Sequence, residues 1–385
     1  MRRFFRFLFA ITALTFVPFG LGLRWLIADE PWASIAAACA VALGTWLLAA
    51  RIRLAIDDRP ISKARRWLER FYFVHWCAGV GSAPLFLLLV PLTLLLRGTI
   101  GQASFIAYAI ALPLALWGVL VRPRRVVVRT VEIVVSGLAP AFDGFRIAHL
   151  SDLHIGGMFP ADEARSVVRL TNSLGVDLVA LTGDYVTSGN RFHAETGRLL
   201  GELKGREGVV AVLGNHDNFG GREPLCSTLI ACGVKLLLNE HIRIERGGAE
   251  LVVAGVDDIY SRRADVGRTF EGVEANAATV TLVHDPRLAE PIAKQTSGLI
   301  LAGHTHWGQL GVPWRSQKLN VAGRRFHAHG GLSDVGAAQL YVHPGIGSTG
   351  VPVRFGVAPE VTVLVLRAKR DLAARPPRGD AEAQT

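Results

Sequence analysis

Apolar residues dominate the first third of the chain in four long runs, at about 7–27, 32–50, 71–96 and 100–121. Each run approaches or exceeds the roughly 20 residues that a helix needs to cross a bilayer. Five tryptophans lie near the ends of the runs, where aromatic belts are expected: Trp25, Trp32, Trp46, Trp67 and Trp76. Because the runs hold few charges, they favour membrane helices over the alternative of buried core helices. The pattern therefore predicts a four-helix transmembrane region over residues 1–125.

After residue 125 the pattern changes to short apolar runs that alternate with helical spacing. Runs such as VDLVALTGD and GVVAVLGNHD are typical of strands buried on both faces, and residues 161–174 and 222–232 have the spacing of helices. This alternation predicts a mixed α/β domain over residues 126–367, with helices outside the strands. Residues 368–385 lack apolar periodicity, which predicts a disordered tail.

The net charge of +10 is concentrated beside the apolar runs. Sixteen Lys/Arg and five Asp/Glu lie in residues 1–130, whereas the rest of the chain is nearly neutral. The basic residues gather before the first run, between the second and third, and after the fourth. The positive-inside rule then places both termini and the α/β domain in the cytoplasm of a multi-pass inner-membrane protein. The basic flanks can attract anionic membrane lipid, and the domain lacks the basic stripe that nucleic-acid binding requires.

The first ten residues, MRRFFRFLFA, have the basic start and apolar centre of a signal peptide. No convincing small-residue cleavage site precedes the second run, which favours a retained first helix. A cleaved helix would change the side of the membrane on which the α/β domain lies. The four cysteines lack zinc-site spacing and imply no disulfide framework.

Five short clusters of metal-ligand residues each follow an apolar run of the α/β domain, in HLSDLHIGG, ALTGDYV, VLGNHDN, TLVHDP and LAGHTHWGQ. Each cluster alone is common in turns, but strand ends of α/β architectures gather ligands, so five in succession predict one site. The set can hold two divalent metals around one bridging carboxylate, an arrangement that suits in-line displacement at phosphorus. Its imidazoles suit Mn, Fe or Zn. The predicted ligands are Asp152, His154, Asp184, Asn215, His284, His304 and His306.

Spacing within the clusters suggests individual roles. Asp152 and His154 are two positions apart, as are His304 and His306, so on extended backbone both side chains of a pair can reach one ion. His216 is a spare imidazole that can protonate the leaving oxygen. Asp217 beside it can hold the ring in orientation, which makes the two residues the predicted catalytic pair.

Further along the chain, RRFHAHGG contains two more imidazoles, His327 and His329. They either extend the site toward the substrate or decorate a mobile loop. The second interpretation is favoured.

In its blocks Asp-x-His, Gly-Asp, Gly-Asn-His-Asp, His and Gly-His-x-His, the chain resembles the calcineurin-like metallophosphoesterase superfamily. All five blocks match, across roughly residues 130–367. The stretch GIGSTGVPVRFGVAPEVTVLVL is also similar to the closing segment of the branch of bacterial membrane-associated phosphodiesterases. The resemblance implies a two-sheet β-sandwich flanked by helices, and a metal-dependent phosphohydrolase of phosphodiesterase or pyrophosphatase type.

The resemblance also implies how the ligands are shared. The first metal would take Asp152, His154, Asp184 and His306, and the second would take Asp184, Asn215, His284 and His304. His216 would be the acid. Many relatives have one span or a signal peptide, so the helical region of this chain bears on its compartment more than on its chemistry.

Four spans beside such a domain favour a phosphorylated, lipid-linked substrate at the bilayer surface, of which UDP-diacylglucosamine is a specific possibility suggested by related bacterial enzymes. One alternative is a broad phosphodiesterase for soluble nucleotides that uses the helices only as an anchor. The other is a membrane transporter or sensor with a regulatory phosphoesterase-like domain, although the spans hold few ionisable residues for a charge relay. The sequence leaves the metal, the substrate and the oligomeric state open.

Overall fold

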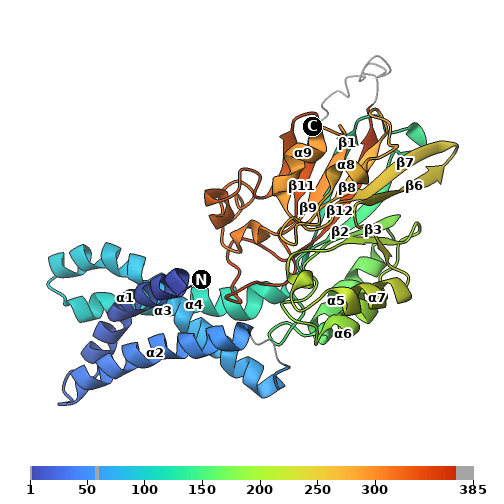
Figure 1. Cartoon of the computed structure of the whole chain (residues 1–385). Coiled ribbons are helices and arrows are strands. Elements are labelled where there is room, and N and C mark those ends of the chain that lie inside the picture. Colours follow the sequence, from blue (N-terminus) through green and yellow to red (C-terminus); the bar gives the residue numbers. More distant parts are fainter. Residues whose placement is uncertain (1, 57–59, 370–385) are drawn as a thin grey trace, which may run out of the picture.

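Helices form the first part of the chain. The computed structural model describes residues 2–56 and 60–369, so the predicted tail lies outside the described residues from position 370 onward. The helices are α1 (Arg2–Leu26), α2 (Ala33–Ile56), α3 (Lys63–Leu95) and α4 (Ile100–Leu116), and α4 continues through η1 (Trp117–Val121) and η2 (Arg122–Arg124). Figure 1 shows the four helices as a group beside the rest of the molecule.

Three helical segments are long and apolar enough to cross a membrane: Phe9–Leu26, Lys63–Leu95 and Ile100–Arg124. Within the described part of α2, the apolar segment is the shorter Ala33–Leu48. The number of crossings, predicted as four, therefore stays a prediction. Large apolar side chains point outward from these helices; Leu87 and Leu88, for example, are 72% and 74% exposed. Such a surface suits contact with lipid tails rather than with water.

Local capping explains where two of the helices begin. The Ser62 side chain accepts a hydrogen bond from the backbone N–H of Arg65 at the start of α3, and Thr99 with Gln102 forms a capping box at the start of α4. The helix α3 begins at Lys63, well before the predicted span at 71–96. The two turns that precede this span are rich in basic residues. These turns carry Arg66 and Arg70 out of the apolar part of the helix.

Two six-stranded sheets pack face to face in the rest of the chain, so the predicted mixed α/β, two-sheet fold is confirmed (Figure 1). The first sheet has the order β1-β12-β2-β3-β4-β5, and the second has the order β10-β11-β9-β8-β7-β6. The strands are β1 (Val127–Val135), β2 (Arg146–Leu150), β3 (Leu178–Thr182), β4 (Val209–Val212), β5 (Lys235–Leu236), β6 (Glu240–Arg246), β7 (Ala249–Gly255), β8 (Thr279–Leu282), β9 (Leu299–Ala302), β10 (Gly331–Val335), β11 (Ala338–Val342) and β12 (Glu360–Ala368). The domain boundaries at 125/126 and 367/368 stay predictions.

The last strand lies in the interior of the first sheet. It pairs in parallel with β1, where Val127 lies opposite Glu360, and antiparallel with β2, where Thr362 lies opposite His149. The sheet is therefore continuous only when the end of the domain has folded back between its first two strands.

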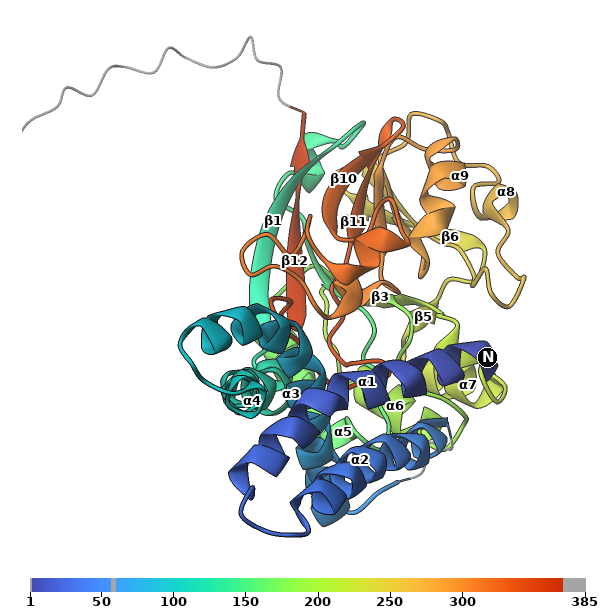
Figure 2. The same ribbon diagram turned by 90° about the vertical axis from the view of Figure 1, so that its left-hand side faces the viewer.

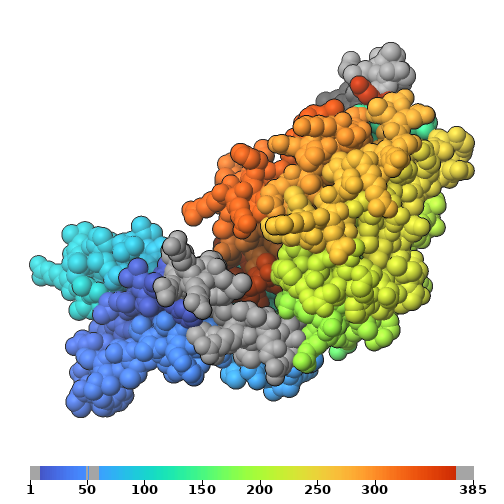
Figure 3. Space-filling view, in the orientation of Figure 1, coloured from blue at the N-terminus to red at the C-terminus, as the bar shows by residue number. Residues whose placement is uncertain are grey.

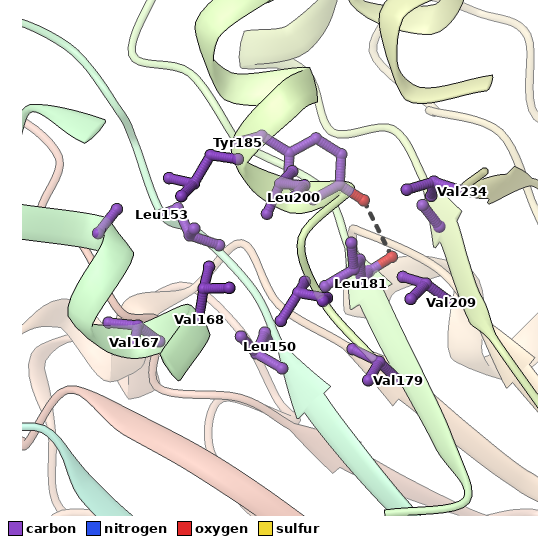
Figure 4. Close-up of a cluster of buried hydrophobic side chains, with 14 of the residues drawn as sticks. Leu150, Leu153, Val167, Val168, Val179, Leu181, Tyr185, Leu200, Val209 and Val234 are labelled. Atoms are coloured by element: carbon purple, nitrogen blue, oxygen red, sulfur yellow. Dashed lines mark hydrogen bonds between the residues drawn. The ribbon is translucent and has the colours of Figure 1, made fainter. Parts of the chain in front are cut away.

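Three apolar layers hold the sandwich together. One lies between the sheets and includes Ile147, Leu282 and Leu301, all fully buried. A second lies between the first sheet and the helices α5 (Ala161–Ser173), α6 (His193–Leu200) and α7 (Glu223–Ala231). In this layer the Tyr185 hydroxyl donates to the Leu181 carbonyl at 3.0 Å (Figure 4). The third lies under α8 (Val266–Thr269) and α9 (Ala289–Ala293) on the outer face of the second sheet.

Hydrogen bonds from α3 and from the end of α4 join the helices to the sandwich, on the side where Figure 2 shows α3 and α4 beneath β1 and β12. In α3, the Arg66 guanidinium donates to the Gly157 carbonyl at 2.9 Å, and Arg70 donates to the Met158 carbonyl at 3.2 Å and to Glu163 at 2.7 and 3.0 Å. After α4, the Gly118 carbonyl accepts the backbone N–H of Arg354 at 2.9 Å. The helices therefore hold the loop that follows β2 and the loop that precedes β12.

Candidate metal centre

The seven predicted ligands lie in loops at the carboxyl ends of five strands. Asp152 and His154 follow β2, Asp184 follows β3, Asn215 follows β4, His284 follows β8, and His304 and His306 follow β9. Strands β2, β3 and β4 are parallel neighbours in one sheet, and β8 and β9 are parallel neighbours in the other. Their carboxyl ends therefore deliver side chains from both sheets to one edge of the sandwich.

One group of ligand atoms consists of Asp152, His154 and His306, all buried. His306 Nε2 lies 3.2 Å from Asp152 Oδ1 and 2.9 Å from His154 Nε2, and His154 Nε2 lies 3.9 Å from Asp152 Oδ1. His306 is 152 positions from His154 along the chain, so only the packing of one sheet on the other brings the two side chains together. The three atoms surround a space that one cation can occupy.

A second group consists of Asp184, His284 and His304. His284 Nε2 lies 3.2 Å from both Asp184 Oδ2 and His304 Nδ1. The other ring nitrogen of His284 donates to the Thr182 carbonyl at 2.7 Å, which fixes the tautomer and points Nε2 into the group.

Asp184 lies between the two groups. Its Oδ2 atom is 3.6 Å from His154 Nε2 in the first group and 3.2 Å from His284 Nε2 in the second. It is 2% exposed, and its Oδ1 atom accepts the backbone N–H of His216 at 2.9 Å. Asp184 is therefore the carboxylate that touches both groups of candidate ligands.

The backbone of these loops is left-handed, not extended. Positive φ angles occur at five of the seven ligands: 55° at Asp152, 49° at His154, 54° at Asp184, 68° at His304 and 49° at His306. The extended geometry expected for the two paired motifs is therefore wrong, although each pair still converges on the site. Non-glycine residues in this conformation cost about 1–3 kcal/mol each, and such strain is concentrated at functional sites.

The donor set fits a pair of divalent cations on observations independent of any motif. Asn215 Oδ1, His154 Nδ1 and His306 Nδ1 are buried and have no hydrogen-bond partner among the described residues. Gly303 and Gly214 make room for the carboxylates: a Cβ at Gly303 would overlap the Asp152 carboxylate, and one at Gly214 would overlap that of Asp184. Buried carboxylates, imidazoles and an amide oxygen are ligands for Mn, Fe or Zn.

Electrostatics favour the ligand-competent forms of most of these groups. Burial by itself raises the pKa of the Asp152 and Asp184 carboxyls. The neighbouring imidazoles, His306 beside Asp152 and His284 beside Asp184, have the larger opposite effect, so the pKa of both carboxyls is lowered. Burial, followed by His284, lowers the pKa of His304 to about 4. His284 differs, because Asp184 outweighs burial and raises its pKa to about 10. To hold a cation, His284 would have to bind through a deprotonated Nε2.

The predicted catalytic pair is only partly brought together. The His216 ring packs edge-on against His154 with centroids 4.7 Å apart, beside the site. Its Nδ1 atom, however, contacts the Thr187 carbonyl oxygen rather than Asp217. The Asp217 carboxylate accepts the backbone N–H groups of Asp184 and Tyr185 at 2.8 Å and of Gly214 at 2.9 Å. The orienting role expected for Asp217 is therefore corrected, because its oxygens hold the Asp184 loop in place.

Three partners of the site were not singled out in the sequence. The Tyr260 hydroxyl lies 3.3 Å from His304 Nε2, and Asp285 Oδ2 lies 3.6 Å from the same atom. Asp285 follows His284 directly, so its position gave a signal, whereas Tyr260 and Thr187 lie in loops without a recognisable pattern. His329, by contrast, turns back onto its own loop, where its ring contacts the carbonyls of Phe326 and Lys318.

Known proteins share this domain. The family model for calcineurin-like phosphoesterases matches residues 145–308. The uncharacterized metallophosphoesterase YkoQ of Bacillus subtilis is 33% identical over 246 residues, which cover 62% of this chain and 90% of that protein. The chain belongs to the calcineurin-like phosphoesterase family. It is therefore a metal-dependent phosphohydrolase and its substrate is phosphorylated; the family generally binds two divalent metals, and the clustered side chains are candidate ligands for them.

Two further relatives are also similar to this chain. The uncharacterized metallophosphoesterase YkuE of Bacillus subtilis is 29% identical over 244 residues, covering 62% of this chain and 85% of that protein. A bovine protein described as a transmembrane protein with metallophosphoesterase domain is 31% identical over 281 residues, covering 68% of this chain and 62% of the bovine protein. Together with the apolar helices, this relative indicates a membrane protein.

Among solved structures, the NAD nucleotidase of Haemophilus influenzae aligns with a TM-score of 0.39 and 15% identity, over 52% of this chain and 45% of that chain. The alignment therefore covers less than half of the NAD nucleotidase chain.

Proposed function

We propose that this phosphohydrolase cleaves phosphodiester or pyrophosphate bonds of lipid-linked substrates at the membrane surface, with UDP-diacylglucosamine as the first candidate. One observation carries the proposal: Arg66 and Arg70 of α3 bind the carbonyls of Gly157 and Met158, in the loop that bears Asp152 and His154. A purely tethering helix would need no contact with that loop. Here the candidate ligands are held beside the helix that enters the bilayer, within reach of a phosphate carried on a lipid.

In this proposal the ligands divide as the family resemblance implies. Asp152, His154, Asp184 and His306 hold one cation, and Asp184, Asn215, His284 and His304 hold the other. When bound, the cations neutralise phosphoryl charge and lower the pKa of water to supply the nucleophile. The chain itself orients these ligands through the Thr182 carbonyl at His284 and the Tyr260 hydroxyl at His304.

His216 is the proposed general acid. Its backbone N–H binds Asp184, and its Nδ1 donates to the Thr187 carbonyl, so two contacts fix the ring against the ligand groups. With Nδ1 engaged, Nε2 is the atom that would deliver a proton to the leaving oxygen. Asp217 acts indirectly, since its carboxylate holds the loop that carries Asp184.

We also propose a multi-pass inner-membrane topology with the sandwich in the cytoplasm. The supporting feature is the basic first part of α3 together with Arg122, Arg124 and Arg125 after α4, since both lie at the ends of the helices nearest the sandwich. A C-terminal fluorescent protein should then fluoresce, and a C-terminal alkaline phosphatase should be inactive. The reverse pattern would place the sandwich outside.

The test of substrate uses purified full-length protein in nanodiscs with Mn²⁺, Zn²⁺ or Mg²⁺. Hydrolysis of UDP-diacylglucosamine is compared with that of a soluble nucleotide diester, and Asp184→Asn serves as the inactive control. We expect the lipid-linked pyrophosphate to have the higher kcat/KM. Efficient turnover of the soluble diester alone would reject the lipid-linked substrate and favour a broad nucleotide phosphodiesterase.

A further inference from the structure

A small hairpin follows the last two candidate ligands, over residues 310–321. Gly311 pairs with Asn320 in an antiparallel bridge, the backbone N–H of Val312 donates to the Leu319 carbonyl at 2.8 Å, and that of Val321 donates to the Leu310 carbonyl at 3.0 Å. The tip is closed by the backbone N–H of Lys318 and of Leu319, which donate to the Arg315 carbonyl at 3.0 and 2.8 Å. The segment is therefore a built element of the domain.

The side chains of the 310–321 hairpin face outward although many are apolar. Trp314 at the tip is 93% exposed, and Leu310, Val312, Leu319 and Val321 are 39–52% exposed. Trp314 also has a φ of 56°, a conformation that is unusual for a bulky residue. A hydrophobic surface of this kind on a protein marks an interaction site.

The charge around this surface has one sign. Residues 307–333 contain no Asp or Glu, whereas Arg315, Lys318, Arg324 and Arg325 are all exposed. An apolar tip bordered by cations complements a surface that is apolar inside and anionic outside. An anionic bilayer has this composition, with headgroups that attract basic residues and an interface that accommodates tryptophan.

The hairpin also lies on the side of the sandwich that faces the membrane helices. Figures 1 and 3 show this part of the chain, in orange, protruding from the sandwich on the side of the helices. Its base is connected to them: the backbone N–H of Gly311 donates to the Phe355 carbonyl at 2.9 Å, and the neighbouring Arg354 binds Gly118 after α4. Val353 packs in the apolar cluster formed by α3 and α4. A bilayer around the helices would therefore be the nearest large surface available to the hairpin.

We infer that the 310–321 hairpin is a second membrane-contact element, which inserts Trp314 into the interface of the bilayer and binds anionic lipid headgroups through Arg315 and Lys318. The same loop returns to the candidate metal centre, where the Phe326 ring lies edge-on against His304 with centroids 5.7 Å apart. Lipid contact at the tip would thus hold the mouth of the site against the membrane. The inference concerns bulk lipid and does not depend on which phosphate ester is cleaved.

Photo-crosslinking of full-length protein in nanodiscs tests this inference. Trp314 is replaced by benzoylphenylalanine, and the matched control carries the same residue in place of Ile230, which is 60% exposed on α7. After irradiation, lipid adducts are counted by mass spectrometry in phosphatidylcholine discs with and without phosphatidylglycerol. We expect several-fold more lipid adducts at position 314 than at position 230, and a further increase with phosphatidylglycerol.

A charge-reversed variant, Arg315→Glu with Lys318→Glu, separates the insertion of residue 314 from the binding of anionic headgroups. It should retain hydrolysis of a soluble diester, which shows that the domain is folded. The yield of lipid adducts at position 314 should no longer increase with phosphatidylglycerol. Equal adduct yields at positions 314 and 230 would overturn the inference. Adducts formed mainly with a second copy of the chain would also overturn it, because they would identify the hairpin as a contact between proteins.

Discussion

The helical region and the sandwich follow opposite rules for apolar side chains. In the helices Leu88 and Leu95 are 74% and 79% exposed, whereas in the sandwich Leu282 and Leu301 are fully buried. The difference shows which solvent each region is built for, since an exposed leucine face is stable in lipid and costly in water. Polar side chains are divided as well, because buried imidazoles and carboxylates gather at the strand ends of the sandwich and arginines gather where the two regions meet.

The largest expected effect on activity is at Asp184, a residue of the sandwich and not of the helical region. Asp184→Asn should lower kcat/KM on the order of 10³-fold or more, because it removes the carboxylate that we propose is shared by both cation positions. Bound metal measured by elemental analysis should fall below two ions per chain, while a cooperative thermal unfolding transition should persist and show that the variant still folds. Asp334→Asn, at an exposed carboxylate of β10, is the control and should retain activity. Activity within tenfold of the wild type in D184N would contradict the bridging role.

Matched leucine truncations test the two packing rules directly. Leu301→Ala should lower the free energy of unfolding by about 2–5 kcal/mol, since it leaves a cavity between the sheets. Leu88→Ala should have little effect in detergent, because detergent already contacts that side chain. Both are measured by thermal unfolding of the full-length protein. Equal losses would mean that Leu88 is buried in an unrecognised protein contact.

The junction between the regions should be weaker than the core but coupled to the site. Arg70→Met should lower the free energy of unfolding by about 1.5–3 kcal/mol, the contribution of hydrogen bonds to charged groups, because the bonds from Arg70 to Glu163 and to the Met158 carbonyl are lost. Hydrogen exchange in residues 156–159 should become faster, and hydrolysis of a soluble diester should fall several-fold. Arg165→Met removes the exposed ion pair between Arg165 of α5 and Glu202, which follows α6, and should change none of these three measurements. Unchanged hydrogen exchange in R70M would show that α3 does not stabilise the loop at residues 156–159.

The smallest expected change in stability comes from charge pairs within the sandwich, and its size depends on pH. Burial raises the pKa of Asp177, but the backbone N–H of Arg146 and the Arg246 guanidinium outweigh it, so the net pKa is lowered. The stabilisation is therefore present above the unfolded value of about 3.8 and is lost as the pH falls through the lower folded value. Asp177→Asn should lower Tm by about 2–4 °C at pH 7 and progressively less below pH ~4.

The exposed pair of Arg243 and Glu250 is the control for Asp177, since Glu250 is half-exposed. Glu250→Gln should shift Tm by less than Asp177→Asn at every pH, because surface pairs contribute about 0–1 kcal/mol. A difference between D177N and the wild type that is constant with pH would show that the charge of Asp177 does not stabilise the fold.

Sequence reasoning was strongest where a short segment contains its own signal. The five ligand motifs, the strand patterns before them and the apolar helices could all be found, because each depends on neighbours within about ten residues. It was weaker for backbone shape, since the left-handed φ angles at Asp152 and His304 are imposed by loops that pack against each other. It also misassigned Asp217, whose partners are backbone groups of a loop some thirty residues away.

By itself the sequence determined the reaction class, the residue types of the candidate ligands, and the presence of membrane-length apolar helices. Only the tertiary structure decided that β12 enters between β1 and β2, that Tyr260 and Thr187 support the site, and that α3 holds the loop of His154. The physical reason is the separation along the chain of the residues that interact. Hydrophobic periodicity and motif spacing are local properties, whereas a site built from both sheets and a helix exists only after segments far apart in the chain have packed together.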